Sequence, residues 1–435
     1  MNRQLMLSIA LIASSQLVAC GDSGSSNSMA SGPRMVGDVA IPNVTAGTNF
    51  SFDLGVVVNH SPGFYAFTDR NNKSVDRIDI ATQKLTTQIA GTGATAFAGA
   101  VGSPVDNSIS GPDGVNDVGP GVMYAGDVSS VKVIDTASNT VTSVINGGLL
   151  AGSGKRADEG CVGSGAALGT YIISSPEASP APFATVIDVR THSVIATINF
   201  VDGTGNPAAG IEQCRYDATN DLWFFNNDGS TVAGAPGGPN PHGELDVLTG
   251  ASVRAIPTGT AVNYSALAGV KIFPMTATPA PGCDPTGLAL GPGTDIAIMC
   301  REGTTGAPLL VQILNRLTGA VVASINAGGG DQLEYDPTSN RYYGASSRWT
   351  ASGNAATGGA CSAASPCTPV MTVIDAATRT LVSMVPTGNN AHSVAVDPIS
   401  GLIFMPYSSA TSPAGCGNCT ANGFINGGVH VLTTH

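Results

Sequence analysis

The chain has 435 residues, of which 42% are hydrophobic and only 11% are charged, and its formal net charge is −12 at pH 7. Charged residues make up roughly a quarter of an average globular protein, so this surface must be built largely from Ser, Thr, Asn and the 56 Gly residues. The composition excludes coiled coils, which need abundant Glu, Lys and Arg, and the negative charge argues against a nucleic-acid partner, which needs a basic surface.

The first 19 residues are typical of a secretory signal peptide. Arg3 precedes an apolar stretch that is too short to span a bilayer permanently. The segment Leu-Val-Ala-Cys at residues 17–20 resembles a bacterial lipobox, in which the Cys becomes the lipidated first residue of the mature protein. We therefore expect Cys20 to carry the lipid and the Ser/Gly-rich residues 20–35 to form a flexible tether.

A lipid anchor places the protein in the bacterial cell envelope. Gly21 rather than Asp follows Cys20, and by analogy with enterobacterial sorting this favours the outer membrane over the inner membrane. No later segment offers 18 consecutive apolar residues, so we expect membrane contact through the lipid alone. We expect the protein to be a monomer.

The rest of the chain is repetitive. Six segments combine a β-branched run, Asp or Asn, two residues, Thr or Ser, and a second β-branched run. Each predicts a β-hairpin in which the Asp or Asn side chain accepts hydrogen bonds from backbone N–H groups of the turn. The segments are RIDIATQKLTTQI, VKVIDTASNTVTSVI, ATVIDVRTHSVIATI, ELDVLTGASVRAI, VQILNRLTGAVVASI and MTVIDAATRTLVSMV, with anchors Asp79, Asp135, Asp188, Asp246, Asn315 and Asp375.

A second pattern precedes each hairpin: a small residue, an acid or His, a short strand, a turn and another strand. It is clear in GIEQCRYDATNDLWFF, GCDPTGLALGPGTDIAIM, GDQLEYDPTSNRYYGA and AHSVAVDPISGLIFMP, and weaker in FDLGVVVNHSPGFYAF, GPDGVNDVGPGVMYAG and DEGCVGSGAALGTYII. Four strands per repeat and seven repeats predict an all-β, seven-bladed β-propeller of four-stranded blades over residues 36–435.

The two ends of the chain predict how the ring closes. After Gly423 the sequence reads FINGGVHVLTTH and stops where the next turn should come, so the seventh blade lacks its last strand. MVGDVAIPN near residue 35 is similar to LVSMVPTGN of the sixth hairpin. We expect this N-terminal strand to complete the last blade and to cover its open edge.

The hairpins and the segment HSVAVDPISGLIFMPYSS resemble the YVTN family of bacterial β-propeller repeats, over about nine-tenths of the mature chain. The family's signature tetrad is approximated here by Tyr65-Ala66-Phe67-Thr68. The resemblance implies the propeller fold and blade packing but no particular activity.

Eight cysteines follow Cys20, and an even number in an exported protein indicates disulfides. Two pairs are close in sequence, and two more are compatible with the predicted blades. The pairs are Cys361–Cys367, Cys416–Cys419, Cys161–Cys214 and Cys283–Cys300. The CxxC at residues 416–419 lacks the following His of a c-type haem site, and we expect it in a loop, which favours a structural bridge over a redox pair.

Ionisable residues recur at the starts of the innermost strands, which line the channel of a propeller and open at one mouth. The ligand or metal candidates are Glu159, Glu212, Asp284, Asp331 and His392, with Asp53, Asp113 and Asp158 at corresponding positions. Clustered carboxylates repel one another, and Ca²⁺ or another divalent cation would relieve this repulsion. The alternative is structural, with the acids capping strand ends and bonding to backbone N–H groups of neighbouring blades.

Two function classes follow. The favoured one is a lipid-anchored binding or scaffold module that holds an envelope protein, a glycan or a small ligand at one propeller face. The alternative is a hydrolase or lyase that uses a divalent cation in the channel, as lactonases of similar architecture do, with His392 as the catalytic base. The Gly-rich stretches lack a P-loop Lys, so we expect no nucleotide.

Overall fold

The computed structural model describes residues 32–59, 62–229, 243–275, 283–300, 309–350, 361–409 and 415–435. From Gly32 onward these residues form one compact unit. The predicted signal peptide, Cys20 and most of the predicted tether lie outside the described residues.

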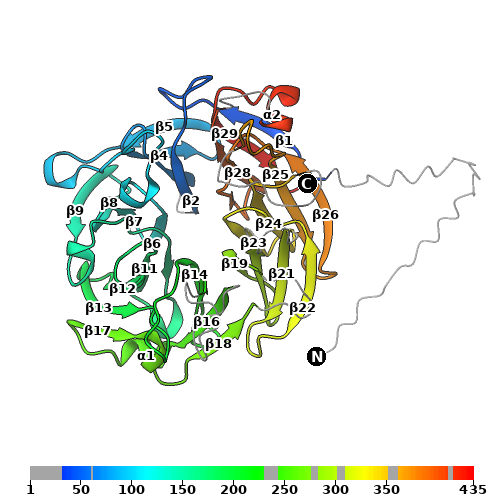
Figure 1. The fold of residues 1–435 in the computed structure, drawn as a ribbon. Coiled ribbons are helices and arrows are strands. Elements are labelled where there is room, and N and C mark those ends of the chain that lie inside the picture. Colours follow the sequence, from blue (N-terminus) through cyan, green and yellow to red (C-terminus); the bar gives the residue numbers. More distant parts are fainter. Residues whose placement is uncertain are drawn as a thin grey trace, which may run out of the picture. The chain divides into compact units, whose positions relative to one another are not determined.

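The strands form seven small sheets, antiparallel except for one added strand in blade 3, arranged as a ring around a central opening (Figure 1). Blade 1 contains β2 (Phe52–Val58), β3 (Phe64–Asp69), β4 (Ser74–Asp79) and β5 (Lys84–Ile89). Blade 2 contains β6 (Val115–Gly119), β7 (Val122–Asp127), β8 (Ser130–Asp135) and β9 (Thr140–Ile145). Blade 3 contains β10 (Gly160–Val162), β11 (Thr170–Ser175), β12 (Phe183–Asp188), β13 (Ser193–Asn199) and β17 (Thr260–Asn263).

Blade 4 contains β14 (Ile211–Asp217), β15 (Leu222–Asn227), β16 (Glu244–Thr249) and β18 (Lys271–Pro274). Blade 5 contains β19 (Pro285–Leu290), β20 (Asp295–Cys300), β21 (Leu310–Asn315) and β22 (Val321–Asn326). Blade 6 contains β23 (Leu333–Asp336), β24 (Arg341–Ser346), β25 (Val370–Asp375) and β26 (Thr380–Pro386). Blade 7 contains β27 (Ala395–Val396), β28 (Leu402–Tyr407), β29 (Gly428–Thr433) and β1 (Met35–Val39). The prediction of a seven-bladed β-propeller is confirmed.

The N-terminal strand completes blade 7, as expected from the sequence. β1 pairs antiparallel with β29, with Asp38 opposite His430 and Val39 opposite Val429. The strand order β1-β29-β28-β27 leaves the last blade with its four strands drawn from both ends of the chain. The ring is therefore closed by hydrogen bonds between the two ends of the chain.

The repeated Asp residues form the turns predicted for them. The Asp79 carboxylate accepts a hydrogen bond of 2.7 Å from the N–H of Thr82, and Asp375 accepts the same bond from Thr378. In these two blades the chain reverses between the third and fourth strands at this point. These bonds lie within four residues of sequence, so the pattern could be recognised without knowing the tertiary structure.

The predicted fourth hairpin is wrong. Residues 250–254 form the short helix α1 (Gly250–Arg254) instead of a strand, because Thr249 caps the helix by accepting a hydrogen bond of 3.1 Å from the Ser252 N–H. Asp246, expected in the turn, is buried inside β16. β18 becomes the last strand of blade 4, and β17 adds to blade 3 as a parallel neighbour of β13.

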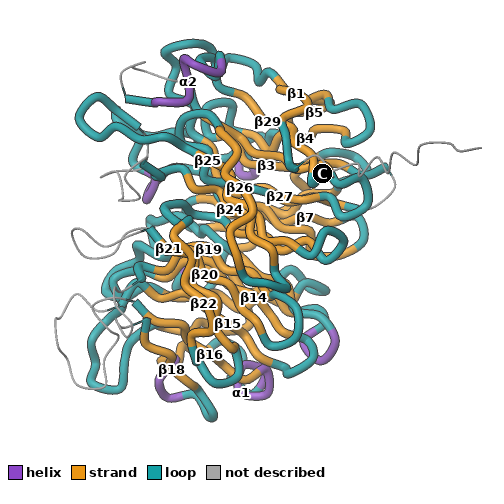
Figure 2. Tube along the Cα trace, turned by 90° about the vertical axis from the view of Figure 1, so that its right-hand side faces the viewer, coloured by secondary structure: helices purple, strands orange, loops and turns teal. Residues whose placement is uncertain are grey.

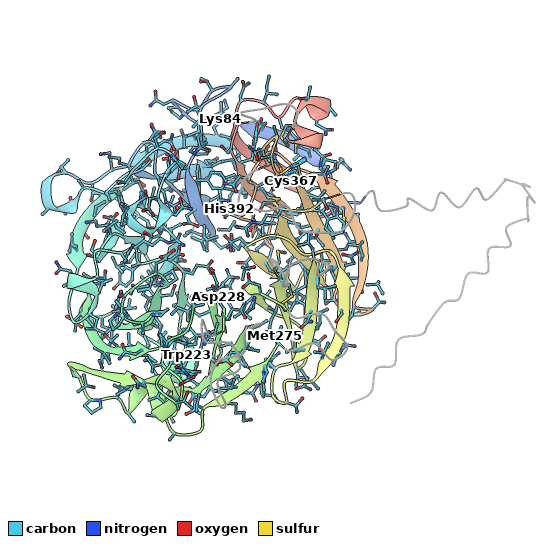
Figure 3. All side chains as sticks on the ribbon, viewed as in Figure 1. Lys84, Trp223, Asp228, Met275, Cys367 and His392 are labelled. Atoms are coloured by element: carbon cyan, nitrogen blue, oxygen red, sulfur yellow. A yellow bond between two sulfur atoms is a disulfide. The ribbon has the colours of Figure 1, made fainter. Side chains whose placement is uncertain are left out.

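A buried polar residue occupies the third position of the third strand in every blade. These residues are Asp76, Lys132, Thr185, Asp246, Gln312, Thr372 and His430. Several bond to a polar residue at the end of the second strand of the same blade. Lys132 Nζ lies 3.3 Å from Asp127 Oδ2, Asn227 donates to Asp246 over 2.8 Å, and Ser346 and Thr372 share a bond of 2.8 Å. Apolar side chains of adjacent blades form the surrounding core, with Trp223 fully buried in blade 4 (Figure 3).

All four expected cysteine pairs form disulfides: Cys161–Cys214, Cys283–Cys300, Cys361–Cys367 and Cys416–Cys419. The first joins the inner strands of blades 3 and 4. The loop expected around the CxxC is instead a short helix, α2 (Gly417–Asn422), which begins directly after Cys416. In the two perpendicular views α2 lies beside blade 7 (Figures 1 and 2).

Five single-turn 3-10 helices lie in connections of the described chain, at Gly93–Thr95, Asn107–Ile109, Leu150–Gly152, Gly165–Ala167 and Tyr264–Ala266. Among the described residues, no helix combines the length and apolar character needed to cross a bilayer.

Candidate functional site

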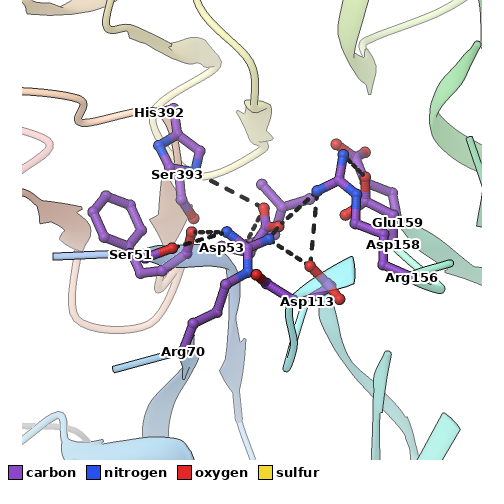
Figure 4. Close-up of polar contacts among 12 residues, drawn as sticks. Ser51, Asp53, Arg70, Asp113, Arg156, Asp158, Glu159, His392 and Ser393 are labelled. Carbon is purple, nitrogen blue, oxygen red and sulfur yellow. Dashed lines mark hydrogen bonds and ion pairs between the residues drawn. The ribbon is translucent and has the colours of Figure 1, made fainter. Parts of the chain in front are cut away.

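Five buried or partly buried ionisable side chains from blades 1, 2 and 3 form a network that we call the mouth cluster. Its members are Asp53, Arg70, Asp113, Arg156 and Asp158 (Figure 4). The acids stand at or just before the starts of the inner strands β2, β6 and β10. Arg70 follows β3, and Arg156 precedes β10.

The two guanidinium groups hold the mouth cluster together. Arg70 Nη2 bonds to both Asp53 and Asp113, and its Nη1 donates to the carbonyl oxygen of Phe52 over 2.9 Å. Arg156 contacts Asp53 at 3.2 Å, Asp158 at 2.8 Å and Glu177, beyond β11, at 2.9 Å. The planar fork of Arg suits this role, because one side chain can serve several carboxylates at once.

The electrostatics differ between members of the cluster. Burial alone would raise the pKa of Asp53, but the charges of Arg70 and Arg156 and the neighbouring His392 ring hold it below the ordinary range. Burial raises the pKa of Asp158 well above its ordinary value despite the charge of Arg156. Asp53 is thus held as a carboxylate by the two arginines, whereas burial favours the neutral form of Asp158.

A second group, the carboxylate triad, consists of Glu159, Glu212 and Asp331, from blades 3, 4 and 6. One ligand oxygen from each lies within 4.8 Å of the other two. Glu159 is 3% exposed. Burial and the negative charges of Asp331, Asp158 and Glu212 raise its pKa well above the ordinary value.

The remaining predicted site residues lie apart from this triad. His392 points toward the central opening (Figure 3), but its ring stacks on Phe52 with centroids 4.5 Å apart. Its Nδ1 donates to the carbonyl oxygen of Asn390 over 2.8 Å, and its Nε2 faces Asp53 Oδ1 at 3.8 Å. Asp284 is half-buried directly before β19 and is not a member of the triad.

Neutral side chains bond to the backbone of neighbouring blades at several positions. Gln213 accepts from the N–H of Leu288 over 2.6 Å, and Gln332 accepts from the N–H of Val394 over 2.9 Å. Ser393 Oγ accepts from the Gly55 N–H over 3.0 Å. Each of these residues directly follows a predicted site residue in sequence, so the structural role and the candidate functional role fall on adjacent positions.

Two cavities flank the charged groups. The first, the mouth pocket, has a volume of about 350 Å³ and is lined by residues of blades 1, 6 and 7 and by Pro104, Val105 and Asn107. Arg70, Asp331 and His392 contribute to its wall. The second, the channel cavity, has a volume of about 260 Å³ and lies further along the inner strands, where Glu159 and the ion pair Arg215–Glu334 line it.

The sequence analysis missed both arginines of the mouth cluster. Arg156 lies in the run Lys155-Arg156-Ala157-Asp158-Glu159, which is unusually charged for a chain with 11% charged residues. This charged run is the feature of the sequence that could have pointed to Arg156. Arg70 lies directly after β3, at a position that the two repeat patterns do not include.

Comparisons with known proteins identify the fold and leave the family open. No family model matches the chain, and no curated protein matches it. A chain of the mitotic checkpoint complex aligns with a TM-score of 0.52 and 10% identity, covering 98% of both chains. Hydrazine synthase of Kuenenia stuttgartiensis aligns with a TM-score of 0.54 and 13% identity, covering 91% of this chain and 99% of the other. The Pan2 WD40 domain of Neurospora crassa aligns with a TM-score of 0.51 and 10% identity, covering 90% and 89%.

These likenesses show the fold. At such low sequence identities, no activity or ligand of these proteins can be inferred for this chain. Membership of the YVTN family stays a prediction from the repeat pattern.

Proposed function

We propose that this protein is a lipid-anchored binding module of the bacterial cell envelope that holds a saccharide unit of a glycan in the mouth pocket. The mixed polar lining of that pocket carries the proposal. Asn49, Asn107 and Asn390 present amide groups, and Asp331 and Arg348 add a carboxylate and a guanidinium group.

This lining matches a polyhydroxylated ligand. Each sugar hydroxyl both donates and accepts hydrogen bonds, and an amide side chain offers both functions in return. The volume of about 350 Å³ lies at the lower end of the range for small-ligand sites. The bonds of Arg70 to Asp53 and Phe52 fix one wall in place before any ligand arrives, which lowers the entropic cost of binding.

The anchor and location rest on the sequence. The lipobox-like segment at residues 17–20 supports lipidation of Cys20, and Gly21 supports sorting to the outer membrane. A Cys20→Ser variant should lose incorporation of radiolabelled palmitate and leave the membrane fraction. Membrane association equal to that of the wild type would contradict the anchor.

A protein partner is the competing ligand. One propeller of similar fold belongs to a mitotic checkpoint complex, and another is a WD40 domain. The enzymatic alternative is less favoured, because His392 is turned toward Asp53 and stacked on Phe52, whereas a general base must reach a substrate proton.

The binding proposal is tested with the full-length lipoprotein in detergent on an array of bacterial envelope saccharides, with affinities measured by calorimetry. Asn107→Trp should fill the mouth pocket and weaken binding at least tenfold. The control, Ala137→Trp, places the same ring on the turn between β8 and β9, at the opposite end of the strands, and should bind as the wild type does. If no saccharide binds, or if both variants bind equally, the proposal is wrong.

A further inference from the structure

The carboxylate triad has a geometry that suits a metal ion. Its oxygens come from three different blades and lie within 4.8 Å of one another. In a Ca²⁺ site the metal–oxygen distance is about 2.3–2.6 Å, so two ligand oxygens on opposite sides of the ion lie roughly 4.8 Å apart. The three oxygens therefore fit around one calcium ion without a change in backbone position.

A second observation concerns Glu159 alone. Its side chain is 3% exposed, and its Oε2 has no hydrogen-bond partner among the described residues. A carboxylate oxygen that is removed from water and left without a donor costs free energy unless a cation or another ligand compensates it. The same carboxyl group contributes one of the three oxygens that converge in the triad.

Three arginines near the two cavities are bound to carboxylates outside the triad. Arg70 bonds to Asp53 and Asp113, and Arg156 bonds to Asp53, Asp158 and Glu177. Arg215 pairs with Glu334 at 2.8 Å. Blade-to-blade backbone bonding is also supplied by other residues, since Gln332 rather than Asp331 accepts from Val394.

We propose that Glu159, Glu212 and Asp331 bind one Ca²⁺ ion between the mouth pocket and the channel cavity. Asp331 lines the first cavity and Glu159 lines the second, so water or a ligand oxygen can complete the coordination sphere from either side. Carboxylates are hard ligands and favour Ca²⁺ or Mg²⁺ over softer metals, and Mg²⁺ requires shorter distances in an octahedral arrangement. This site goes beyond the proposed saccharide binding and does not depend on it.

The first test uses the wild-type, full-length protein in detergent after dialysis against EDTA. Equilibrium dialysis with radioactive calcium should give one ion per chain, and 2 mM CaCl₂ should raise the melting temperature by a few degrees, since binding only to the folded state stabilises it. MgCl₂ at the same concentration should give a smaller shift. Absence of both the bound ion and the shift with CaCl₂ overturns the proposal.

The second test assigns the ion to the triad. Asp331→Asn, a half-buried position, should weaken calcium binding at least tenfold and remove the shift. Glu177→Gln is the matched control, because it removes one negative charge from the same mouth but outside the triad. It should bind calcium as the wild type does.

Circular dichroism checks that both variants are folded. If Asp331→Asn is unfolded, Asp331→Glu replaces it and should bind calcium with altered affinity. Equal affinity of wild type, Asp331→Asn and Glu177→Gln would mean that the ion lies elsewhere and would overturn the assignment.

Discussion

The hydroxyl of Tyr407 on β28 donates a hydrogen bond of 2.6 Å to the carboxylate of Asp38 on the closing strand β1. The ring of Tyr407 stacks on His430, with centroids 3.8 Å apart, and His430 Nδ1 lies 3.4 Å from the other oxygen of Asp38. His430 Nε2 accepts a hydrogen bond from the Gly388 N–H. The N-terminal strand is therefore joined to the last blade by side chains as well as by its backbone ladder.

Loss of the Tyr407 hydroxyl should loosen this closure. Tyr407→Phe keeps the stacked ring and removes the bond to Asp38, which should lower the free energy of unfolding by about 1 kcal/mol. Hydrogen exchange should accelerate at the backbone amides of residues 35–39. Tyr216→Phe is the control, since it also removes a bond to a carboxylate, of Asp221 at 2.7 Å, but within blade 4. Equal exchange of β1 in both variants would contradict a closing role for Tyr407.

The buried pair Asp69 and Asp76 of blade 1 should make stability depend on pH. Burial raises the pKa of Asp76 to about 8 and that of Asp69 to about 6, whereas an unfolded Asp titrates near about 3.9. The folded protein thus holds more protons than the unfolded chain between about pH 4 and pH 8. This contribution to stability is present below about pH 4 and is lost as the pH rises through 6 and 8.

Asp76→Asn removes the more strongly shifted of these groups and retains an oxygen that can accept from Ser74. At pH 8 the variant should be more stable than the wild type by on the order of 3 kcal/mol, and the difference should shrink toward pH 4. Urea unfolding at several pH values measures it. Asp79→Asn in the exposed turn of the same blade, where Thr82 lowers the pKa of the carboxyl, should show no gain at pH 8. A stability difference between Asp76→Asn and the wild type that does not change with pH would contradict the raised pKa values of Asp69 and Asp76.

The fold could be predicted because its signal is local. The bond of Asp79 to Thr82 spans three residues, and similar residues repeat it in other blades. The last strand of blade 4 could not be predicted from such a local pattern. The last strand of that blade is β18, which begins 22 residues after the end of β16. Whether the intervening residues form a helix or a strand depends on the Thr249 cap and on contacts with other blades.

The candidate site could be predicted only in part. Glu159, Glu212 and Asp331 could be predicted to lie close together, because the inner strands of all blades begin at the same mouth of the channel. Which acids meet one another, and which meet an arginine, depends on distances across the ring. Arg70 and Arg156 come from connections outside the repeat pattern. Their ion pairs with Asp53 and Asp113 could therefore not be predicted from the spacing of the repeats.

The disulfide between blades should matter more than the local one. Cys161 and Cys214 are 53 residues apart, whereas Cys416 and Cys419 are 3 apart. In the chain-entropy description the first bridge contributes about 4 kcal/mol and the second about 2 kcal/mol, because a longer closed loop restricts the unfolded chain more. The double variant Cys161→Ser/Cys214→Ser should therefore melt at a lower temperature than Cys416→Ser/Cys419→Ser under oxidising conditions. The reverse order would show that strain or unfolded-state structure decides the effect.

Arg156 should be the residue of the mouth cluster on which stability depends most. It lies within 4.0 Å of four carboxylates, at 3.2 Å from Asp53, 2.8 Å from Asp158, 2.9 Å from Glu177 and 3.7 Å from Asp113. A Lys side chain keeps the charge but ends in a single ammonium group, which cannot serve all of these partners.

Arg156→Lys should consequently leave buried carboxylates without a donor and lower the free energy of unfolding by about 3 kcal/mol, as measured by urea denaturation at pH 7. Arg190→Lys is the matched control, because Arg190 pairs with Asp188 on the surface and its side chain is 79% exposed. That exchange should change stability by less than about 0.5 kcal/mol. If both variants lose the same free energy of unfolding, the four contacts of Arg156 stabilise the fold no more than an ordinary surface ion pair does.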